Sequence, residues 1–255
     1  MKKFPILEFD SDRNAFLKPT DWVKRANETV DRCVLCFFAE AIEKVLSEYE
    51  HKIIGYFKAE SLILPVYAVN YEGKKIALVQ AGVGAPIAAA QIEEVTALTG
   101  CDKYIACGSC GSLINEIAVG HLFIPTTAVR DEGTSYHYAP PSREIEADAD
   151  AVQVIADVLA EHKVPYMAAK TWTTDGIYRE TPAKIKRRKE EGCMTVEMET
   201  AAYIAATRYN GAKFGQILYA GDNLGGEEWD SRDYTNRTDI REMVLRLAIE
   251  ACGKL

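Results

Sequence analysis

Apolar and polar positions follow two different periods along the chain, and each change of period predicts a new element. The apolar run 33–38 (CVLCFF) has the length of a buried strand, whereas 39–48 (AEAIEKVLSE) has the spacing of an amphipathic helix. Further strands are expected at 52–57, 64–70, 75–81, 103–107, 121–129, 166–172, 194–198 and 214–220. Further helices are expected at 86–98, 147–162, 181–191, 200–209 and 236–252.

This order of elements predicts one α/β domain. Strands that alternate with helices form a mostly parallel sheet with helices on both faces, and the turn expected at 72–74 adds an antiparallel hairpin. We therefore predict a single-domain, three-layer α/β/α fold with a central mixed, largely parallel sheet. It spans 33–255 and follows an N-terminal extension, 1–32. Ligands of such sheets bind outside the carboxyl ends of the strands, so the loops at those ends are the candidates for function.

Charge and composition exclude several classes of function. The 255-residue chain has a formal net charge of −8, which argues against a nucleic-acid or anionic-membrane binder, because phosphate polymers are bound by clustered Lys and Arg. The basic run 184–189 is expected to be a solvated helix face. No stretch has the pattern of a signal peptide or a membrane span, so we expect a cytoplasmic protein.

The seven cysteines are expected to be reduced thiols, because their number is odd and they are scattered along the chain. Cys33 and Cys36 form one C-x-x-C pair and Cys107 and Cys110 another, a spacing that zinc sites also use. Residues i and i+3 of a strand point to opposite faces, however, so the first pair could not easily share one ion. We expect no metal site.

Two glycine-containing junctions could bring backbone N–H groups to a ligand. The first, 81–86, is compatible with an approach to an anion or a sugar, although a tight turn would need the same glycines. The second, 107–111, offers small residues and the hydroxyl of Ser109, which suit a phosphate or the edge of a base. A crowded chain crossing would also require small side chains there.

Two other junctions carry acids at the ends of apolar strands. Glu197 and Glu199 would share one face of an extended chain, and buried carboxylates need partners such as the vicinal hydroxyls of a sugar. A helix N-terminus would explain one of these glutamates but less easily both. Asp222 ends the strand 214–220 and is either a general acid or the start of an Asx turn.

Taken together, these junctions resemble the nucleoside phosphorylase family, which includes purine nucleoside phosphorylase, uridine phosphorylase and methylthioadenosine/adenosylhomocysteine nucleosidase. The resemblance rests on 108–111 (GSCG) and 196–199 (VEME). The segment 126–140 is similar to uridine phosphorylase, whereas Asp222 is similar to the purine-specific and nucleosidase members. The family relationship implies an enzyme that cleaves the N-glycosidic bond of a nucleoside, and we expect a purine nucleoside.

The resemblance also implies a role for each matching residue. Glu199 would bind the ribose hydroxyls above Met198, Asp222 would protonate the purine N7, and Gly108 and Ser109 would bind phosphate. The base would contact Cys110, Gly111, Ile177, Tyr178, Val196, Glu197 and Gly221. No cofactor is implied beyond inorganic phosphate as co-substrate. The family also implies a homo-oligomer, a dimer or a trimer of dimers.

The sequence departs from the family at the phosphate-binding arginines. The loop 36–42 has neither Gly nor Arg, and Ala106 stands where a second Arg is usual. Phosphate would then be held by Ser109, backbone N–H groups and either Lys58 or Arg179, which is the alternative we prefer. In the other alternative the nucleophile is water and Glu40 activates it. A non-catalytic nucleoside-binding protein is a third possibility, and Asp222 argues against it.

Overall fold

The computed structural model describes residues 4–255, so the first three residues of the predicted extension 1–32 lie outside the described part. The strands are β1 (Arg32–Cys36), β2 (His51–Ala59), β3 (Leu62–Tyr71), β4 (Lys74–Gln80), β5 (Lys103–Ser112), β6 (Leu122–Asp131), β7 (Glu144–Glu146), β8 (Tyr166–Thr174), β9 (Cys193–Glu197) and β10 (Lys213–Asn223). The α-helices are α1 (Pro19–Trp22), α2 (Ala39–Glu48), α3 (Ala85–Thr99), α4 (Ala149–Glu161), α5 (Pro182–Glu190), α6 (Thr200–Tyr209) and α7 (Thr238–Lys254). Short 3-10 turns are η1 (Pro5–Leu7), η2 (Thr134–His137), η3 (Ile177–Arg179) and η4 (Tyr234–Asn236).

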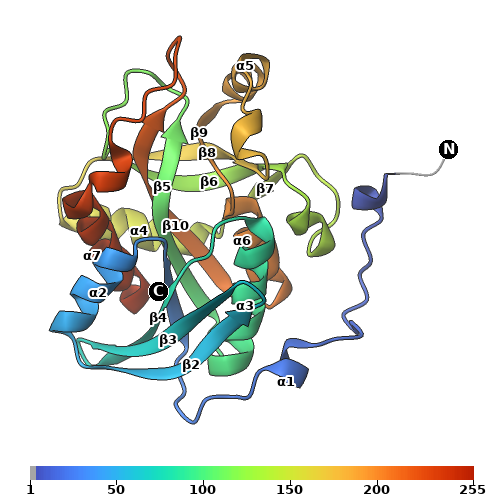
Figure 1. Cartoon of the computed structure of the whole chain (residues 1–255), viewed down its shortest axis with the longest axis vertical. Helices are drawn as coiled ribbons and strands as arrows, with labels where there is room; N and C mark the ends of the chain where they lie inside the picture. The colour runs from blue at the N-terminus through green and yellow to red at the C-terminus, as the bar shows by residue number, and fades with distance from the viewer. Residues whose placement is uncertain (1–3) are drawn as a thin grey trace.

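One mixed sheet runs through the whole domain, in the order β10-β6-β8-β9-β5-β1-β4-β3-β2 (Figure 1). Strands β4, β1, β5 and β10 are mutually parallel neighbours, and β6, β8 and β9 form a second parallel set. The hairpins of β2, β3 and β4 add the antiparallel edge that the sequence predicted. Strand β5 also pairs with both β9 and β10, so β5, β10, β6, β8 and β9 close into a ring.

Helices cover both faces of the sheet, which confirms the predicted three-layer α/β/α class (Figure 1). Successive residues of β1 point to opposite faces, as the strand period requires. Val34 and Cys36 pack with α2, α4 and α7, whereas Cys33 and Leu35 pack with α3 and α6. The two thiols of the first C-x-x-C pair therefore lie on opposite sides of the sheet, as expected.

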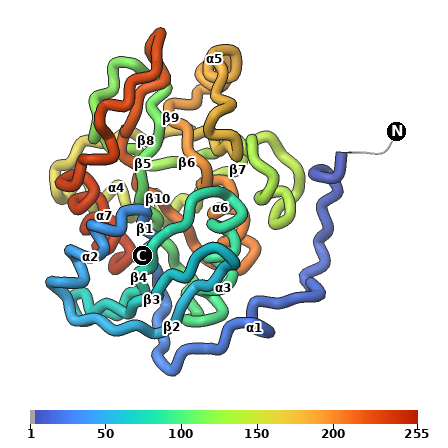
Figure 2. The backbone as a smooth tube through the Cα atoms, in the orientation of Figure 1, coloured from blue at the N-terminus to red at the C-terminus, as the bar shows by residue number. Residues whose placement is uncertain are grey.

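The N-terminal segment has little regular structure. From residue 4 to β1 it forms only η1 and the four-residue α1, and it runs along one side of the body (Figure 2). Arg13 contacts the ring of Tyr209 at 4.7 Å from the ring centre. Several apolar side chains of this segment, including Phe16 and Trp22, are exposed. Within residues 4–255, no helix combines the length and the apolar character needed to cross a bilayer.

The two largest errors in the predicted boundaries both lie at the candidate site. Residues 108–112 were expected to be a loop but continue β5 as far as Ser112, and β10 continues past Ala220 to Asn223. Both extensions occur because the two strands are paired along most of their length, up to a register shift between Ala220 and Asn223. This partner strand lies more than a hundred positions away in the sequence and is not visible in a local pattern.

Candidate active site

A cavity of about 330 Å³ opens where β5, β9 and β10 end, at the side of the sheet that the parallel-strand rule predicts. It is lined by Phe37, Phe38, Val83, Ser109, Cys110, Gly111, Ile177, Glu180, Val196, Glu197, Met198, Glu199, Leu218, Asp222, Leu224, Tyr234 and Arg241. The lining is mostly apolar with a few convergent polar groups, a composition typical of small-molecule sites. Glu199 and Asp222, which the sequence singled out separately, both contribute to this single cavity.

Glu199 is a buried carboxylate with its side chain in the cavity wall. It lies between the end of β9 and the start of α6, and it is only 5% exposed. Its Oε1 atom accepts a hydrogen bond of 2.6 Å from the backbone N–H of Gly84. Burial, and secondly the charge of Glu197, raise the pKa of Glu199 to about 8. A ligand whose hydroxyl groups donate hydrogen bonds to this carboxylate would offset the cost of burying its charge.

Glu197 has a different role from Glu199. One of its oxygens, Oε2, accepts the backbone N–H groups of Glu199 and Thr200 at 2.7 and 2.6 Å, and Oε1 accepts the hydroxyl of Thr173 at 2.6 Å. The two backbone N–H groups are donors of the first turn of α6 that have no partner within the helix, and an acceptor at a helix start satisfies such donors. The helix-start interpretation therefore accounts for Glu197 and leaves Glu199 for another role, while a contact of Glu197 with a base stays a prediction.

Asp222 lies in the irregular end of β10, where the pairing with β5 shifts register between Ala220 and Asn223. Its Oδ2 atom accepts a hydrogen bond of 2.7 Å from Nε1 of Trp229, whose ring is otherwise exposed. The predicted Asx turn does occur, but it is made by the next residue: Oδ1 of Asn223 accepts the N–H of Gly225 at 3.0 Å. The Asx-turn alternative for Asp222 was therefore wrong by one position, and Asp222 is left facing the cavity.

The backbone of Gly111 leaves room for the carboxylate of Asp222. A Cβ atom at position 111 would lie 2.5 Å from Leu224 and 2.9 Å from Val196, so a side chain there would displace one of them, and it would lie in contact with Oδ1 of Asp222 at 3.4 Å. The small residue predicted to line the base pocket thus lies beside the predicted acid.

Glu180 is a second carboxylate near Asp222 that the sequence did not reveal. It lines the cavity just before α5 begins. Burial, and secondly the charge of Asp222, raise the pKa of Glu180 to about 7. No local pattern distinguishes Glu180, because it lies in a polar stretch that is typical of an ordinary helix start.

Six predicted residues do not line the cavity. Tyr178 is 91% exposed and points away, so Ile177 alone contributes from that segment. Gly108 and Gly221 serve packing instead: a Cβ atom would meet the ring of Phe37 at 2.9 Å or the ring of Tyr234 at 3.2 Å. Glu40 pairs with Arg241 beside the cavity rather than in its wall. The proposed cations Lys58 and Arg179 are also outside the lining.

Aromatic and cationic residues from loops and from the last helix complete the cavity and were missed. Phe37 and Phe38 follow β1, Tyr234 lies in η4, and Arg241 lies in the second turn of α7. The paired phenylalanines were included in the predicted strand 33–38, and Arg241 has no local feature that separates it from a surface cation. Within residues 4–255, no group of three or more His, Cys, Asp or Glu is arranged to hold a metal ion.

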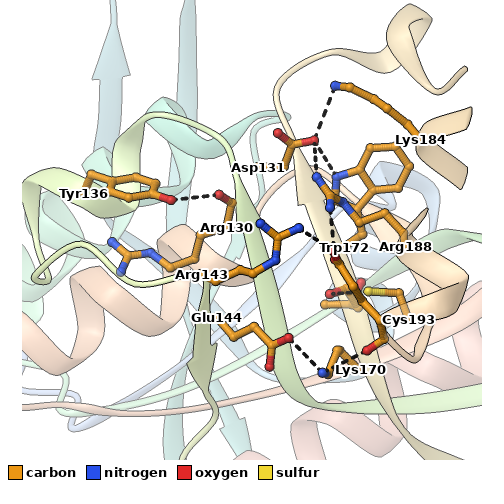
Figure 3. Close-up of polar contacts among 12 residues, drawn as sticks. Arg130, Asp131, Tyr136, Arg143, Glu144, Lys170, Trp172, Lys184, Arg188 and Cys193 are labelled. Carbon is orange, nitrogen blue, oxygen red and sulfur yellow. Dashed lines mark hydrogen bonds and ion pairs between the residues drawn. The ribbon is translucent and has the colours of Figure 1, made fainter. Parts of the chain in front are cut away.

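Helix α5, which follows Glu180 of the cavity wall, is held to the sheet by a cluster around Asp131 (Figure 3). Oδ2 of Asp131 accepts Nε1 of Trp172 at 3.0 Å and is paired with Arg188 at 3.2 Å and Lys184 at 3.4 Å. The guanidinium of Arg188 lies over the ring of Trp172, 5.3 Å from its centre. The basic run of α5 is therefore not wholly a solvated face as predicted, because Arg188 is buried in this cluster.

The fold is a three-layer α/β/α domain whose cavity contains buried carboxyl groups, and comparison with known proteins gives the family. The model of the phosphorylase superfamily matches residues 31–251, so the chain belongs to this superfamily of nucleoside phosphorylases and nucleosidases. A guanosine phosphorylase of Halorubrum lacusprofundi is 25% identical over 73% of this chain and 79% of its own length. A DeoD-type purine nucleoside phosphorylase of Bacillus cereus is 27% identical over 71% and 77%.

Solved structures share the fold. A uridine phosphorylase from Vibrio fischeri superposes with a TM-score of 0.75 at 20% identity, over 91% of this chain and 98% of that one. An AMP nucleosidase from Bacteroides thetaiotaomicron gives a TM-score of 0.71 at 22% identity, over 89% and 88%. The predicted family relationship is thus confirmed, and these neighbours include both phosphorylases and a nucleosidase.

Proposed function

We propose that this protein cleaves the N-glycosidic bond of a purine nucleoside by phosphorolysis, releasing the free base and a pentose 1-phosphate. An oxygen of phosphate forms a bond to C1′ of the sugar while the bond from C1′ to N9 of the base breaks. Asp222 donates a proton to N7, which takes up the electron pair that leaves with the base. Glu199 accepts hydrogen bonds from the 2′- and 3′-hydroxyls and holds the sugar over Met198.

The observation that carries this proposal is the presence of Glu199 and Asp222 in one cavity. A carboxylate buried with a single backbone donor from Gly84 is suited to a pair of hydroxyl donors. A second acid in the same wall, Asp222 beside Gly111, is suited to a leaving group that gains negative charge. The cavity volume of about 330 Å³ lies in the range of small-ligand sites.

The choice of purine and of phosphate has separate support. The sequence relatives are named guanosine phosphorylase and purine nucleoside phosphorylase, at 25% and 27% identity. A hydrogen-bonding acid such as Asp222 matches purine N7, for which pyrimidine bases have no equivalent atom. Ser109 supplies a hydroxyl in the same cavity for an oxyanion.

The test is the release of free base from adenosine, guanosine, inosine and uridine, each with and without inorganic phosphate. We expect base only when phosphate is present, together with pentose 1-phosphate in equal amount, and a preference for the purine nucleosides. Base released equally without phosphate would establish hydrolysis instead. Tight nucleoside binding without any base release would identify a nucleoside-binding protein and refute the enzymatic proposal.

We also propose that the protein is a homo-oligomer. Large apolar side chains are exposed on β2, on β3 and at the cavity loop, namely Ile53, Tyr56, Ile63 and Val83. Large exposed apolar side chains are often covered at an interface, and a second copy of the chain is the partner that the family suggests. Light scattering after size-exclusion chromatography should give a mass that is a multiple of 28.3 kDa, and a mass equal to one chain would refute the proposal.

A further inference from the structure

Three residues from distant parts of the chain form a polar cluster at one end of the cavity. Ser109 on β5 and Tyr219 on β10 are register partners in the parallel pairing of these strands. The phenol oxygen of Tyr219 accepts a hydrogen bond of 3.2 Å from Nε of Arg241 on α7. Burial raises the pKa of Tyr219, and hydrogen bonds with the side chains of Arg241 and Ser109 offset part of that rise. A hydroxyl, a phenol and a guanidinium thus adjoin one another, and Ser109 and Arg241 line the cavity.

Arg241 is held by several contacts and keeps its charge. Its side chain is 14% exposed, and its guanidinium lies over the ring of Phe38, 4.8 Å from the ring centre. Nη1 forms an ion pair of 2.7 Å with Glu40. Burial disfavours the charge of Arg241, but the contacts with Tyr219 and Glu40 outweigh it, so that the pKa of Arg241 is raised. A guanidinium has more N–H donors than these two bonds use, and the others remain for a ligand.

The charges around the cavity leave one place for an anion. Among the described residues that line it, the ionisable carboxyl groups are Glu180, Glu197, Glu199 and Asp222, and Arg241 is the only cation. A phosphate dianion near the carboxylates would be repelled, whereas beside Arg241 and Ser109 it would receive charge-assisted and hydroxyl hydrogen bonds.

We infer that Arg241 is the residue that binds and positions the phosphate nucleophile, and that Glu40 is its resident counter-ion. In the absence of phosphate, Glu40 neutralises the guanidinium; an arriving phosphate binds the N–H donors that Glu40 leaves free, and the two anions share one positive charge. Ser109 donates its hydroxyl to the same anion. This inference rests on the proposed phosphorolysis for its catalytic meaning, although the binding of phosphate itself is independent of turnover. It places the cation on the last helix, where neither Lys58 nor Arg179 lies.

The structure offers a matched control on the same two helices. Arg246 of α7 pairs with Glu48 of α2 at 2.8 Å, just as Arg241 of α7 pairs with Glu40 of α2, but Arg246 lies outside the cavity lining. Arg241→Gln and Arg246→Gln therefore remove the same charge and the same kind of helix–helix ion pair. Only the first removes a donor from the cavity.

The experiment measures binding of inorganic phosphate by calorimetry without nucleoside, and then the KM values for phosphate and for nucleoside. We expect Arg241→Gln to weaken phosphate binding by roughly 10- to 100-fold, the range for loss of a charged hydrogen bond, with the KM for nucleoside changed less than about twofold. Arg241→Lys should lose less phosphate affinity than Arg241→Gln, because lysine keeps the positive charge although it lacks the paired N–H donors of the guanidinium. Arg246→Gln should bind phosphate as the unmodified protein does. If Arg241→Gln fails to fold, phosphate binding by Arg241→Lys and Glu40→Gln tests the role of Arg241 instead.

Glu40→Gln distinguishes the two possible roles of Glu40, which are counter-ion of Arg241 and activator of a water nucleophile. As a counter-ion, its neutralisation should tighten phosphate binding and lower the KM for phosphate. Weaker phosphate binding in this variant, or loss of a phosphate-independent base release, would overturn the counter-ion assignment. Unchanged phosphate binding in Arg241→Gln, or no phosphate binding by the unmodified protein, would overturn the role of Arg241. Base release that needs no phosphate, with phosphate still bound through Arg241, would refute the phosphorolysis but leave the anion site standing.

Discussion

The carboxylate of Glu199 accepts its hydrogen bond from the backbone N–H of Gly84, a residue 115 positions earlier in the chain, at 2.6 Å. Gly84 has φ of +99° and ψ of 144°, a conformation that residues with a Cβ rarely adopt. The glycine-containing turn before α3 therefore orients the main candidate sugar ligand, which is a more specific role than that of a tight turn.

Gly84→Ala should impair nucleoside binding more than it impairs the fold. We expect a loss of about 1–2 kcal/mol in the free energy of unfolding from the strained φ, and an increase of about tenfold in the KM for nucleoside as Glu199 loses its orientation. Gly73→Ala is the control, because Gly73 has φ of +79° in the β3–β4 hairpin and nothing within 4 Å of an added Cβ. Equal KM values in the two variants would show that the turn does not position Glu199.

Nucleoside binding should depend on pH through Glu199. The pKa of Glu199 is about 8 in the fold against an ordinary value of 4.5, so at neutral pH the group is largely protonated, and the proposed ligand contact requires the carboxylate. The KM for nucleoside should therefore fall as the pH rises through about 8, by at most about tenfold per pH unit. Initial rates between about pH 6 and pH 9 measure this, and a KM independent of pH would contradict the assignment.

The same shift in pKa predicts how stability changes with pH. Between 4.5 and about 8 the folded state retains a proton on Glu199 that the unfolded chain releases, so the free energy of unfolding should decrease as the pH rises across this window. Glu199→Gln removes the free-energy cost of ionising this buried carboxyl group. We therefore expect the variant to show a flatter pH dependence of stability and a higher stability at alkaline pH. Activity should fall by at least about 10²-fold, because an amide accepts weaker bonds from hydroxyls. Urea unfolding at several pH values gives the stability, and an unaltered pH dependence in Glu199→Gln would refute the prediction.

Asp222→Asn should lower kcat by about 10²–10⁴-fold on ordinary purine nucleosides, the contribution of a well-placed general acid. A purine nucleoside methylated at N7 already carries the positive charge that protonation would supply, so its cleavage should be far less affected. Asp230→Asn, at an exposed acid of the segment that follows β10, is the control and should retain activity. An equal loss on both substrates would show that Asp222 contributes to structure or binding rather than to protonation of the base.

The sequence predicted the elements well and the ends of strands less well, for a physical reason. The period of apolar residues reports which face of an element is buried, and this gave the helices α2 and α6 with their observed bounds. The ends of β5 and β10 depend on their mutual pairing, which involves residues more than a hundred positions apart. Local patterns contain no information on such a partner.

The residues of the candidate site also divide into those that a local pattern reveals and those that depend on tertiary packing. Residues in short conspicuous motifs, such as Ser109, Met198 and Glu199, could be predicted to face a ligand, and the structure brings them into one cavity. Residues that reach the cavity only through tertiary packing, such as Glu180 and Arg241, could not. In the opposite direction, Gly108 stands in a conspicuous motif because the ring of Phe37 packs against it, not because it lines the cavity.

The cluster around Asp131 predicts that a mutation outside the cavity weakens both stability and binding (Figure 3). Arg188→Met removes a buried cation that pairs with Asp131 and lies over Trp172, whereas Lys184 and Trp172 stay paired with Asp131, so it should cost about 1–3 kcal/mol in the free energy of unfolding. Because α5 follows Glu180 at the cavity wall, we also expect a higher KM for nucleoside. Lys186→Met, at an exposed position of the same helix whose pair with Glu190 is 4.0 Å long, should change stability by less than about 0.5 kcal/mol. Denaturant unfolding of both variants measures the difference, and similar values would mean that the cluster does not anchor the helix.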